Sequence, residues 1–144
     1  MNKLFATVFS ILIYSVSYAQ ELISDTIVVN DTRIILKHPQ NCVVQDFPYE
    51  EGTIKTLNFK NGNISIFCGT MVKLPLVSTK EIKIDSEFKL FNDVRIIRGV
   101  HKWGHFREDD FIKYGISILY QSVSEEEVPF YENILNSAII EKIK

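Results

Sequence analysis

The chain has 144 residues, of which 46% are hydrophobic and 24% are charged, and its formal net charge is −2. These values are ordinary for a folded globular protein and exclude a low-complexity or disordered chain. The weak negative charge gives no electrostatic reason to expect binding to nucleic acid or to an anionic membrane surface.

The first nineteen residues have the pattern of a secretory signal peptide. A short basic start at residues 1–3 precedes an uncharged apolar stretch at 4–16, and small residues then stand at the two positions that a signal peptidase reads, Ser17 and Ala19. The apolar stretch is too short for a comfortable membrane span, and we expect no other span once the signal is removed. We therefore expect a periplasmic or secreted protein whose mature part, residues 20–144, forms a single globular domain.

Two hairpins are predicted in the first half of the mature chain. Thr26–Val29 and Arg33–Leu36 flank Asn30-Asp31, which is a turn signal. The second hairpin turns at Asn61-Gly62, because this dipeptide suits a two-residue turn in which both residues have positive φ.

The second turn implies a register as well. It pairs Phe59 with Ile64, Leu57 with Ile66, and Lys55 with Cys68. The apolar members of these pairs then share one face, and Cys68 is predicted to face the core.

The second half of the chain predicts further strands and then a helix. The strands are expected at 81–85, 94–100 and 114–123, with Gly115 marking a bulge in the last. Ser124 followed by Glu127 fits a capping box at the start of a helix. Apolar residues then recur at three- and four-residue spacing, which gives one stripe that must be buried on the sheet: Tyr131, Ile134, Leu135, Ala138 and Ile139. The fold class predicted is α+β, an antiparallel β-sheet with a C-terminal amphipathic helix packed on one face.

This order of elements resembles the PsbP and Mog1-like α/β sandwich group. The resemblance is carried by three stretches: His38-Pro39-Gln40-Asn41, the strand Ile64 to Cys68, and the last segment from Ile116 through Ser124-Glu125-Glu126-Glu127 to Ile134-Leu135-Asn136-Ser137. It covers the layout of most of the mature chain. Members of the group are often non-catalytic binding or assembly factors, so the resemblance implies a role of that kind.

The densest polar segment, residues 101–110, holds the candidate functional residues. Aromatic residues and arginine are enriched at binding hot spots, so the segment predicts a protein-binding surface: Trp103, His105, Phe106, Arg107 and Phe111. The alternative is a metal or small-ligand site at His101, His105 and Asp109, since two histidines four residues apart can share a face. A second candidate surface is the aromatic and acidic stretch Phe47-Pro48-Tyr49-Glu50-Glu51.

The chain has two cysteines that could form a disulfide. Cys42 and Cys68 are the two cysteines of the chain, and an even number in an exported protein favours a disulfide. The alternative is two buried free thiols.

No nucleophile elbow, phosphate loop or cofactor motif is present, and we expect no cofactor. The sequence therefore favours a small exported, non-enzymatic protein that binds another protein, such as an inhibitor, an immunity protein or an envelope assembly factor. On this hypothesis Trp103 and Arg107 lie on the binding surface.

Overall fold

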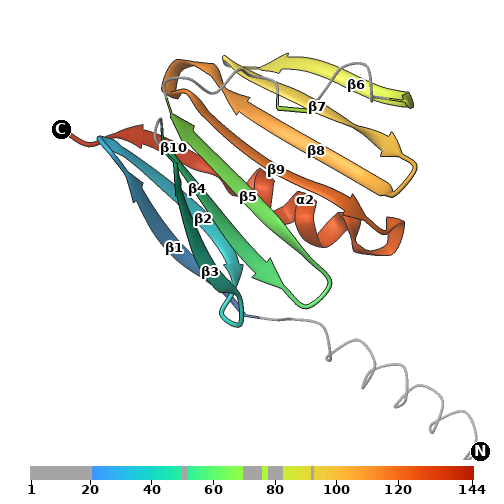
Figure 1. The fold of residues 1–144 in the computed structure, drawn as a ribbon, viewed down its shortest axis with the longest axis horizontal. Helices are drawn as coiled ribbons and strands as arrows, with labels where there is room; N and C mark the ends of the chain where they lie inside the picture. Colours follow the sequence, from blue (N-terminus) through green and yellow to red (C-terminus); the bar gives the residue numbers. More distant parts are fainter. Residues whose placement is uncertain (1–20, 50–51, 70–75, 78–82, 92) are drawn as a thin grey trace, which may run out of the picture.

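A computed structural model of the chain describes residues 21–49, 52–69, 76–77, 83–91 and 93–144 (Figure 1). The predicted signal peptide and residues 81–82 of one predicted strand lie outside these ranges. The described elements are ten strands, two 3₁₀ turns and one α-helix, which follow in chain order: β1 (Leu22–Val29), β2 (Thr32–Pro39), β3 (Val43–Tyr49), β4 (Gly52–Phe59), β5 (Gly62–Gly69), β6 (Lys83–Phe91), β7 (Val94–His101), β8 (Gly104–Phe111), η1 (Ile112–Tyr114), β9 (Ile116–Val123), η2 (Glu125–Glu127), α2 (Val128–Asn136) and β10 (Ile139–Lys142).

The strands form two sheets in which every described pair is antiparallel. The larger sheet has the order β3-β4-β5-β9-β8-β7-β6, and the smaller one has the order β1-β2-β10. β9 therefore leaves the chain order and inserts between β5 and β8, which makes β8 and β9 central strands (Figure 1).

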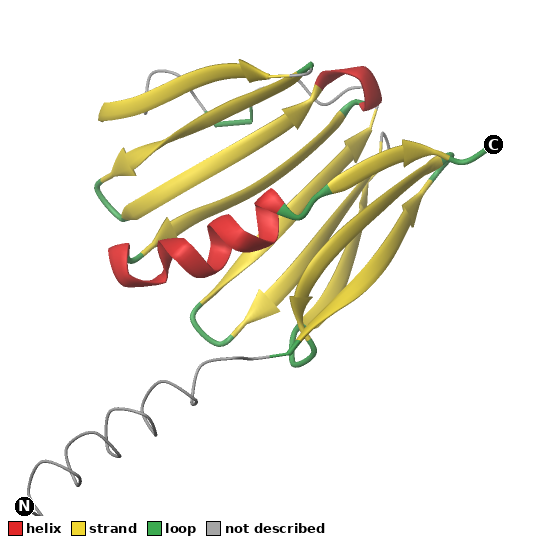
Figure 2. Ribbon diagram, turned by 180° about the vertical axis from the view of Figure 1, so that it is seen from behind, coloured by secondary structure: helices red, strands yellow, loops and turns green. Residues whose placement is uncertain are grey.

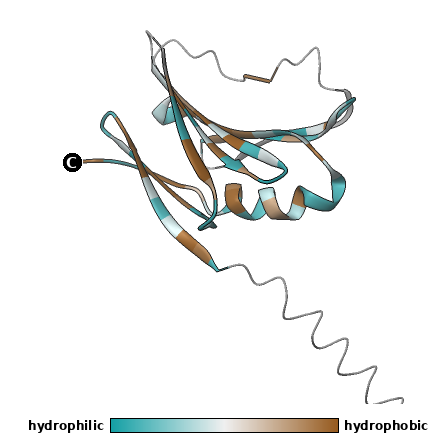
Figure 3. Cartoon of the chain, turned by 60° about the horizontal axis from the view of Figure 1, so that its bottom comes forward, coloured by the Kyte–Doolittle hydropathy of each residue, from teal (hydrophilic) through white to brown (hydrophobic). Residues whose placement is uncertain are grey.

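The helix α2 lies across one face of the larger sheet (Figure 2). In Figure 3 the smaller sheet lies beside the helix. Buried apolar side chains of the larger sheet, the smaller sheet and the helix form one core cluster. The core draws its buried residues from all three parts, for example Leu36 of β2, Ile66 of β5 and Ile134 of α2. The expected α+β class, with a C-terminal helix on one face of an antiparallel sheet, is confirmed.

The first hairpin is confirmed. β1 and β2 pair with Val29 opposite Thr32, so Asn30-Asp31 is the two-residue turn, and Asn30 has a φ of 53°. A positive φ is tolerated by asparagine better than by most residues, because its short polar side chain bonds locally.

The second hairpin forms two residues out of the predicted register. Phe59 pairs with Gly62 and Leu57 with Ile64, so the turn consists of Lys60 and Asn61. Because the shift is even, the same side chains still face the core, and the prediction for Cys68 is confirmed.

Gly62 has a packing role in place of the expected turn role. A Cβ atom at Gly62 would lie 2.6 Å from Oη of Tyr131, so a larger residue here would have to displace the Tyr131 hydroxyl where the helix approaches the strand. Gly115 also differs from expectation: it has a φ of 64° and ends the turn η1 between β8 and β9, where a bulge was predicted.

The helix is shorter than its predicted stripe. It ends at Asn136, after which the hydroxyl of Ser137 donates to the carbonyl of Ile134 at 2.6 Å. Ile139 then belongs to β10 and is 56% exposed, so its place in the stripe was wrong. Among the described residues, no helix is long and apolar enough to cross a membrane.

Candidate functional site

The central strand β8 carries four consecutive charged residues, Arg107-Glu108-Asp109-Asp110, and all four are buried. Side chains of a strand alternate between the two faces of the sheet. Arg107 and Asp109 therefore point toward α2, while Glu108 and Asp110 point to the opposite face. A buried charge is tolerated only where it is paired and hydrogen-bonded, so each face must supply its own partners.

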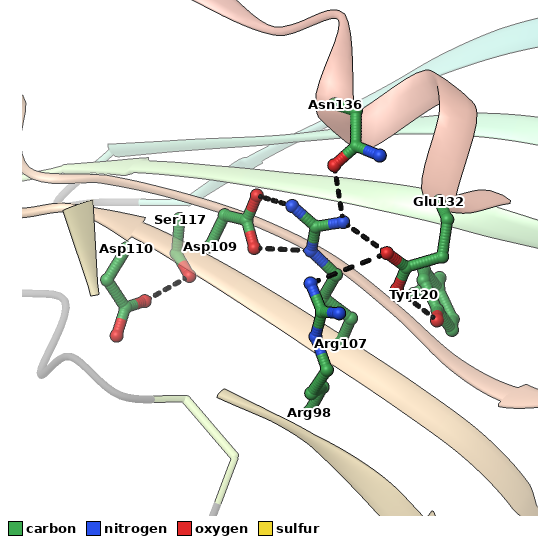
Figure 4. Close-up of polar contacts among 8 residues, drawn as sticks. All are labelled: Arg98, Arg107, Asp109, Asp110, Ser117, Tyr120, Glu132 and Asn136. Carbon is green, nitrogen blue, oxygen red and sulfur yellow. Dashed lines mark hydrogen bonds and ion pairs between the residues drawn. The ribbon is translucent and has the colours of Figure 1, made fainter. Parts of the chain in front are cut away.

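On the helix side, Arg107 is the centre of a hydrogen-bond network (Figure 4). Its Nε and Nη2 donate to the two carboxylate oxygens of Asp109, both at 2.7 Å. Its Nη1 donates to Oε2 of Glu132 at 2.5 Å and to Oδ1 of Asn136 at 2.8 Å. Glu132 and Asn136 are one helical turn apart, so a single guanidinium holds two positions of α2 against β8.

Two further residues complete the charge balance of this network. The hydroxyl of Tyr120 donates to Oε1 of Glu132 at 3.0 Å, and Nη2 of Arg98 lies 3.4 Å from Oε2 of Glu132. Two arginines thus face two carboxylates, with no net charge. Burial opposes the charge of Arg107, but the hydrogen bonds and the charges of Asp109 and Glu132 outweigh it and raise the pKa of the guanidinium.

On the opposite face, Glu108 and Asp110 share the hydroxyl of Ser117. Ser117 Oγ lies 3.0 Å from Oε1 of Glu108 and 2.7 Å from Oδ1 of Asp110, and one hydroxyl proton serves only one of them. Asp110 also pairs with Nε of Arg95 at 3.0 Å. Burial, together with the neighbouring Asp110, raises the pKa of Glu108 to about 7.

Glu108 also accepts hydrogen bonds from the backbone of residues 76–77. The N–H groups of Leu76 and Val77 donate to its two carboxylate oxygens at 2.5 and 2.7 Å. This side chain therefore anchors a connecting segment to the face of the sheet that α2 does not cover.

A cleft of about 360 Å³ opens beside the Arg107 network, between β7, β8, β9 and the first half of α2. Its lining combines four polar residues with apolar ones: Arg98, Gly99, Val100, His105, Phe106, Tyr120, Val128 and Glu132. The Nε of Arg98 is buried and has no hydrogen-bond partner. A concave, mainly apolar site with a few convergent polar groups is the usual form of a small-molecule site.

The structure separates the residues of the predicted binding surface. Trp103 is 67% exposed at the β7–β8 turn, but Phe106 and Arg107 are 2% and 3% exposed. His105 is half-buried in the cleft, and Phe111 packs against the core. Placing Phe106 and Arg107 on a surface was wrong, because the segment is a central strand and not a loop.

The predicted metal-ligating residues also do not meet. Asp109 is four residues from His105 along β8, which is about 13 Å in a strand, and its carboxylate is held by Arg107. His101 accepts a hydrogen bond from the backbone N–H of Trp103 at 3.1 Å and stacks on Phe106. Within the described ranges, no group of three His, Cys, Asp or Glu residues is placed to hold a metal ion.

The predicted disulfide is wrong, since Cys42 and Cys68 are both free thiols. Cys42 precedes Val43, which pairs with Asn58, whereas Cys68 pairs with Thr53. These two positions of β4 are five residues apart, or about 17 Å, and a disulfide needs Cα atoms within about 7 Å. Burial raises the pKa of the Cys68 thiol to about 11.

Sequence reasoning missed Glu132, Arg98 and Tyr120 as partners of Arg107. The one signal in the sequence was the position of Glu132, which directly follows Tyr131 of the apolar stripe and so lies near the buried face of the helix. A comparison with known proteins finds no match among protein-family models, curated proteins or solved structures. The resemblance to the PsbP and Mog1-like group stays a prediction.

We predict that Arg107→Met lowers the free energy of unfolding by about 3–5 kcal/mol, because it leaves Asp109 buried without its ion-pair partner and leaves Glu132 with only the more distant Arg98. Arg107→Lys is also expected to destabilise, since an ammonium does not reproduce the bidentate contact. Urea denaturation measures both losses.

The matched control is Arg33→Met. Arg33 pairs with Glu141 at 3.0 Å, but both side chains are nearly half exposed, so the expected loss is below about 1 kcal/mol. Equal losses for Arg107→Met and Arg33→Met would contradict the structural role of the buried network.

The raised pKa of Glu108 predicts how the free energy of unfolding depends on pH. Because the folded state holds the proton of Glu108 more tightly than the unfolded chain, with a pKa of about 7 against 4.5, this group stabilises the fold at low pH. That contribution is lost as the pH rises through 7. We expect Glu108→Gln to reduce the fall in unfolding free energy between about pH 5 and pH 8, by on the order of 1 kcal/mol.

Urea denaturation at the two pH values checks this expectation. Glu141→Gln, at an exposed carboxylate, should leave the pH dependence as it is in the wild type. An unchanged fall in Glu108→Gln would show that Glu108 is ionised in the folded protein throughout this range.

Proposed function

We propose that this chain is a small exported, non-enzymatic protein that acts by binding another protein through the exposed edge strand β3. Residues 1–19 support export through their signal-peptide pattern. Inhibitor, immunity and envelope assembly proteins are the classes that this description fits.

The observation that carries the proposal is the exposure of large apolar side chains on β3. In the described part of the chain β3 is an end strand of the larger sheet, with β4 as its one neighbour. Val43 is 60% exposed, Val44 is 44% exposed and Phe47 is 50% exposed. An edge strand presents unpaired backbone groups, and exposed apolar side chains beside them invite a further strand from another chain.

The two faces of β3 differ in character. Val43 and Phe47 lie opposite Asn58 and Ile54 on the side of the sheet away from α2, whereas Asp46 bonds to Nζ of Lys55 at 2.7 Å. We propose that an extended segment of the partner pairs with β3 and buries Val43 and Phe47. Phe47 belongs to the second surface that the sequence indicated.

Affinity capture with the tagged mature protein, using the envelope fraction of its own host, tests this function. We expect one stoichiometric protein partner for the wild type, and at least tenfold less of that partner for Val43→Lys and for Phe47→Asp, because a charge replaces the apolar contact. Circular dichroism establishes that these variants are folded.

Two controls complete the experiment. Ile139→Lys changes an equally exposed apolar residue on another edge strand, β10, and should retain the partner. Trp103→Ala tests the surface that the sequence predicted. Loss of the partner in Trp103→Ala alone would move the interface to the β7–β8 turn, and the lack of any stoichiometric partner would contradict the binding function itself.

The cleft beside α2 favours a second function, the binding of a small organic acid. Arg98 and His105 line the cleft and suit a carboxylate, while Val100, Phe106 and Val128 suit an apolar body. This retains His105 from the predicted ligand site but not His101 or Asp109.

Benzoate is a suitable probe for this second function. We expect millimolar benzoate to shift the NMR amide resonances of Val100, His105 and Val128, and Arg98→Gln to abolish these shifts. Arg33→Gln is the control for a general loss of positive charge. Shifts that are absent, or scattered over the surface, would exclude an acid-binding cleft.

A further inference from the structure

A thiol, an imidazole and a carboxylate lie next to one another at the end of the smaller sheet, with the imidazole between the other two. His38 of β2 is 1% exposed, and its Nδ1 lies 3.3 Å from Sγ of Cys42, the residue just before β3. On the other side of the ring, Nε2 lies 3.5 Å from Oδ2 of Asp25 in β1. A nucleophile within reach of a base, which is in turn oriented by a third group, is the arrangement that activates a thiol.

The strand pairing explains why these residues meet. His38 lies opposite Ile23, two residues from Asp25 on the same inward face of the hairpin. The turn after Pro39 then brings Cys42 back toward the ring. The triad thus depends on the β1–β2 register and on the short connection to β3.

Each ring nitrogen of His38 faces an oxygen atom. Nδ1 lies 2.9 Å from the carbonyl oxygen of Pro39, so a proton on Nδ1 has an acceptor, and Nε2 faces the carboxylate of Asp25. In a neutral ring only one of the two nitrogens carries a hydrogen. The other nitrogen then faces an oxygen with no hydrogen to donate to it. In the structure Nε2 is buried and makes no hydrogen bond, and its contact with Asp25 is the 3.5 Å approach of the two side chains. A ring that has accepted a proton from the thiol therefore has an oxygen atom opposite each of its N–H groups.

The two thiols of the chain differ in what they can reach. Cys68 is 3% exposed inside the core, while Cys42 is half-buried at the edge of it. Burial, and to a smaller extent the charge of Asp25, raise the pKa of the Cys42 thiol, so that the group needs a base in order to react. His38 supplies that base.

We propose that Cys42, His38 and Asp25 form a reactive thiol centre that undergoes exchange with low-molecular-weight disulfides. His38 takes the proton of the thiol, and Sγ of Cys42 attacks one sulfur of the external disulfide. The external S–S bond breaks, a mixed disulfide forms on Cys42, and the released thiolate takes the proton back from His38. One disulfide and one thiol enter, and one disulfide and one thiol leave. This centre is independent of the partner-binding function proposed above.

The test is the rate at which the folded protein reacts with 5,5′-dithiobis(2-nitrobenzoic acid), followed by the absorbance of the released thiolate. Mass spectrometry locates the label, which we expect on Cys42 and not on Cys68. We expect Asp25→Asn to react at least fivefold more slowly than the wild type, because asparagine does not balance the imidazolium.

The direction of this change separates the triad from a simple charge effect. Removing a carboxylate near a thiol otherwise favours the thiolate and speeds its reaction with an anionic disulfide. Asp31→Asn, at an exposed carboxylate in the β1–β2 turn, is the matched control and should react within twofold of the wild type. An Asp25→Asn rate less than fivefold below the wild type, or above it, would overturn the proposal, as would a label on Cys68.

Discussion

The buried guanidinium of Arg107 is the group on which the placement of the helix depends. Its contacts with Glu132 and Asn136 define which turn of α2 faces β8, because apolar packing alone permits small rotations and shifts of a helix. Such a network contributes little net stability compared with a well-packed apolar set of the same size. Its effect is to make one arrangement of helix and sheet far better than its neighbours, since every other arrangement leaves a charge unpaired.

The same constraint organises the other face of β8. Alternation separates four adjacent charges into two pairs, so that Glu108 and Asp110 lie on the face opposite Arg107. There they meet Ser117, the backbone of residues 76–77 and the side chain of Arg95. A strand with charges on both faces can be central only if both faces are covered by partners. The insertion of β9 beside β8 supplies Ser117 to one face and Tyr120 to the other.

The proposed binding strand β3 and the proposed thiol centre are neighbours in the fold. Cys42 directly precedes Val43, so a segment that pairs with β3 would begin beside the thiol. The register of the β1–β2 hairpin places Asp25 and His38 next to this end of the larger sheet, because Pro39 ends β2 and the connection to β3 is short. A binding strand and a reactive group thus share one region, although each depends on different contacts.

Local patterns in the sequence were sufficient for the fold class, the first hairpin, the inward face of Ile64, Ile66 and Cys68, and the position of a C-terminal helix. These features depend on spacing between near neighbours, because a strand repeats every two residues and a helix every 3.6. The burial of Arg107, the separation of Cys42 from Cys68 and the meeting of Asp25 with His38 were decided only by the tertiary structure. Each depends on which distant strand or helix lies alongside, as when Glu132 neutralises an arginine 25 residues earlier in the chain. A charged segment looks the same in the sequence whether water or a buried partner solvates it.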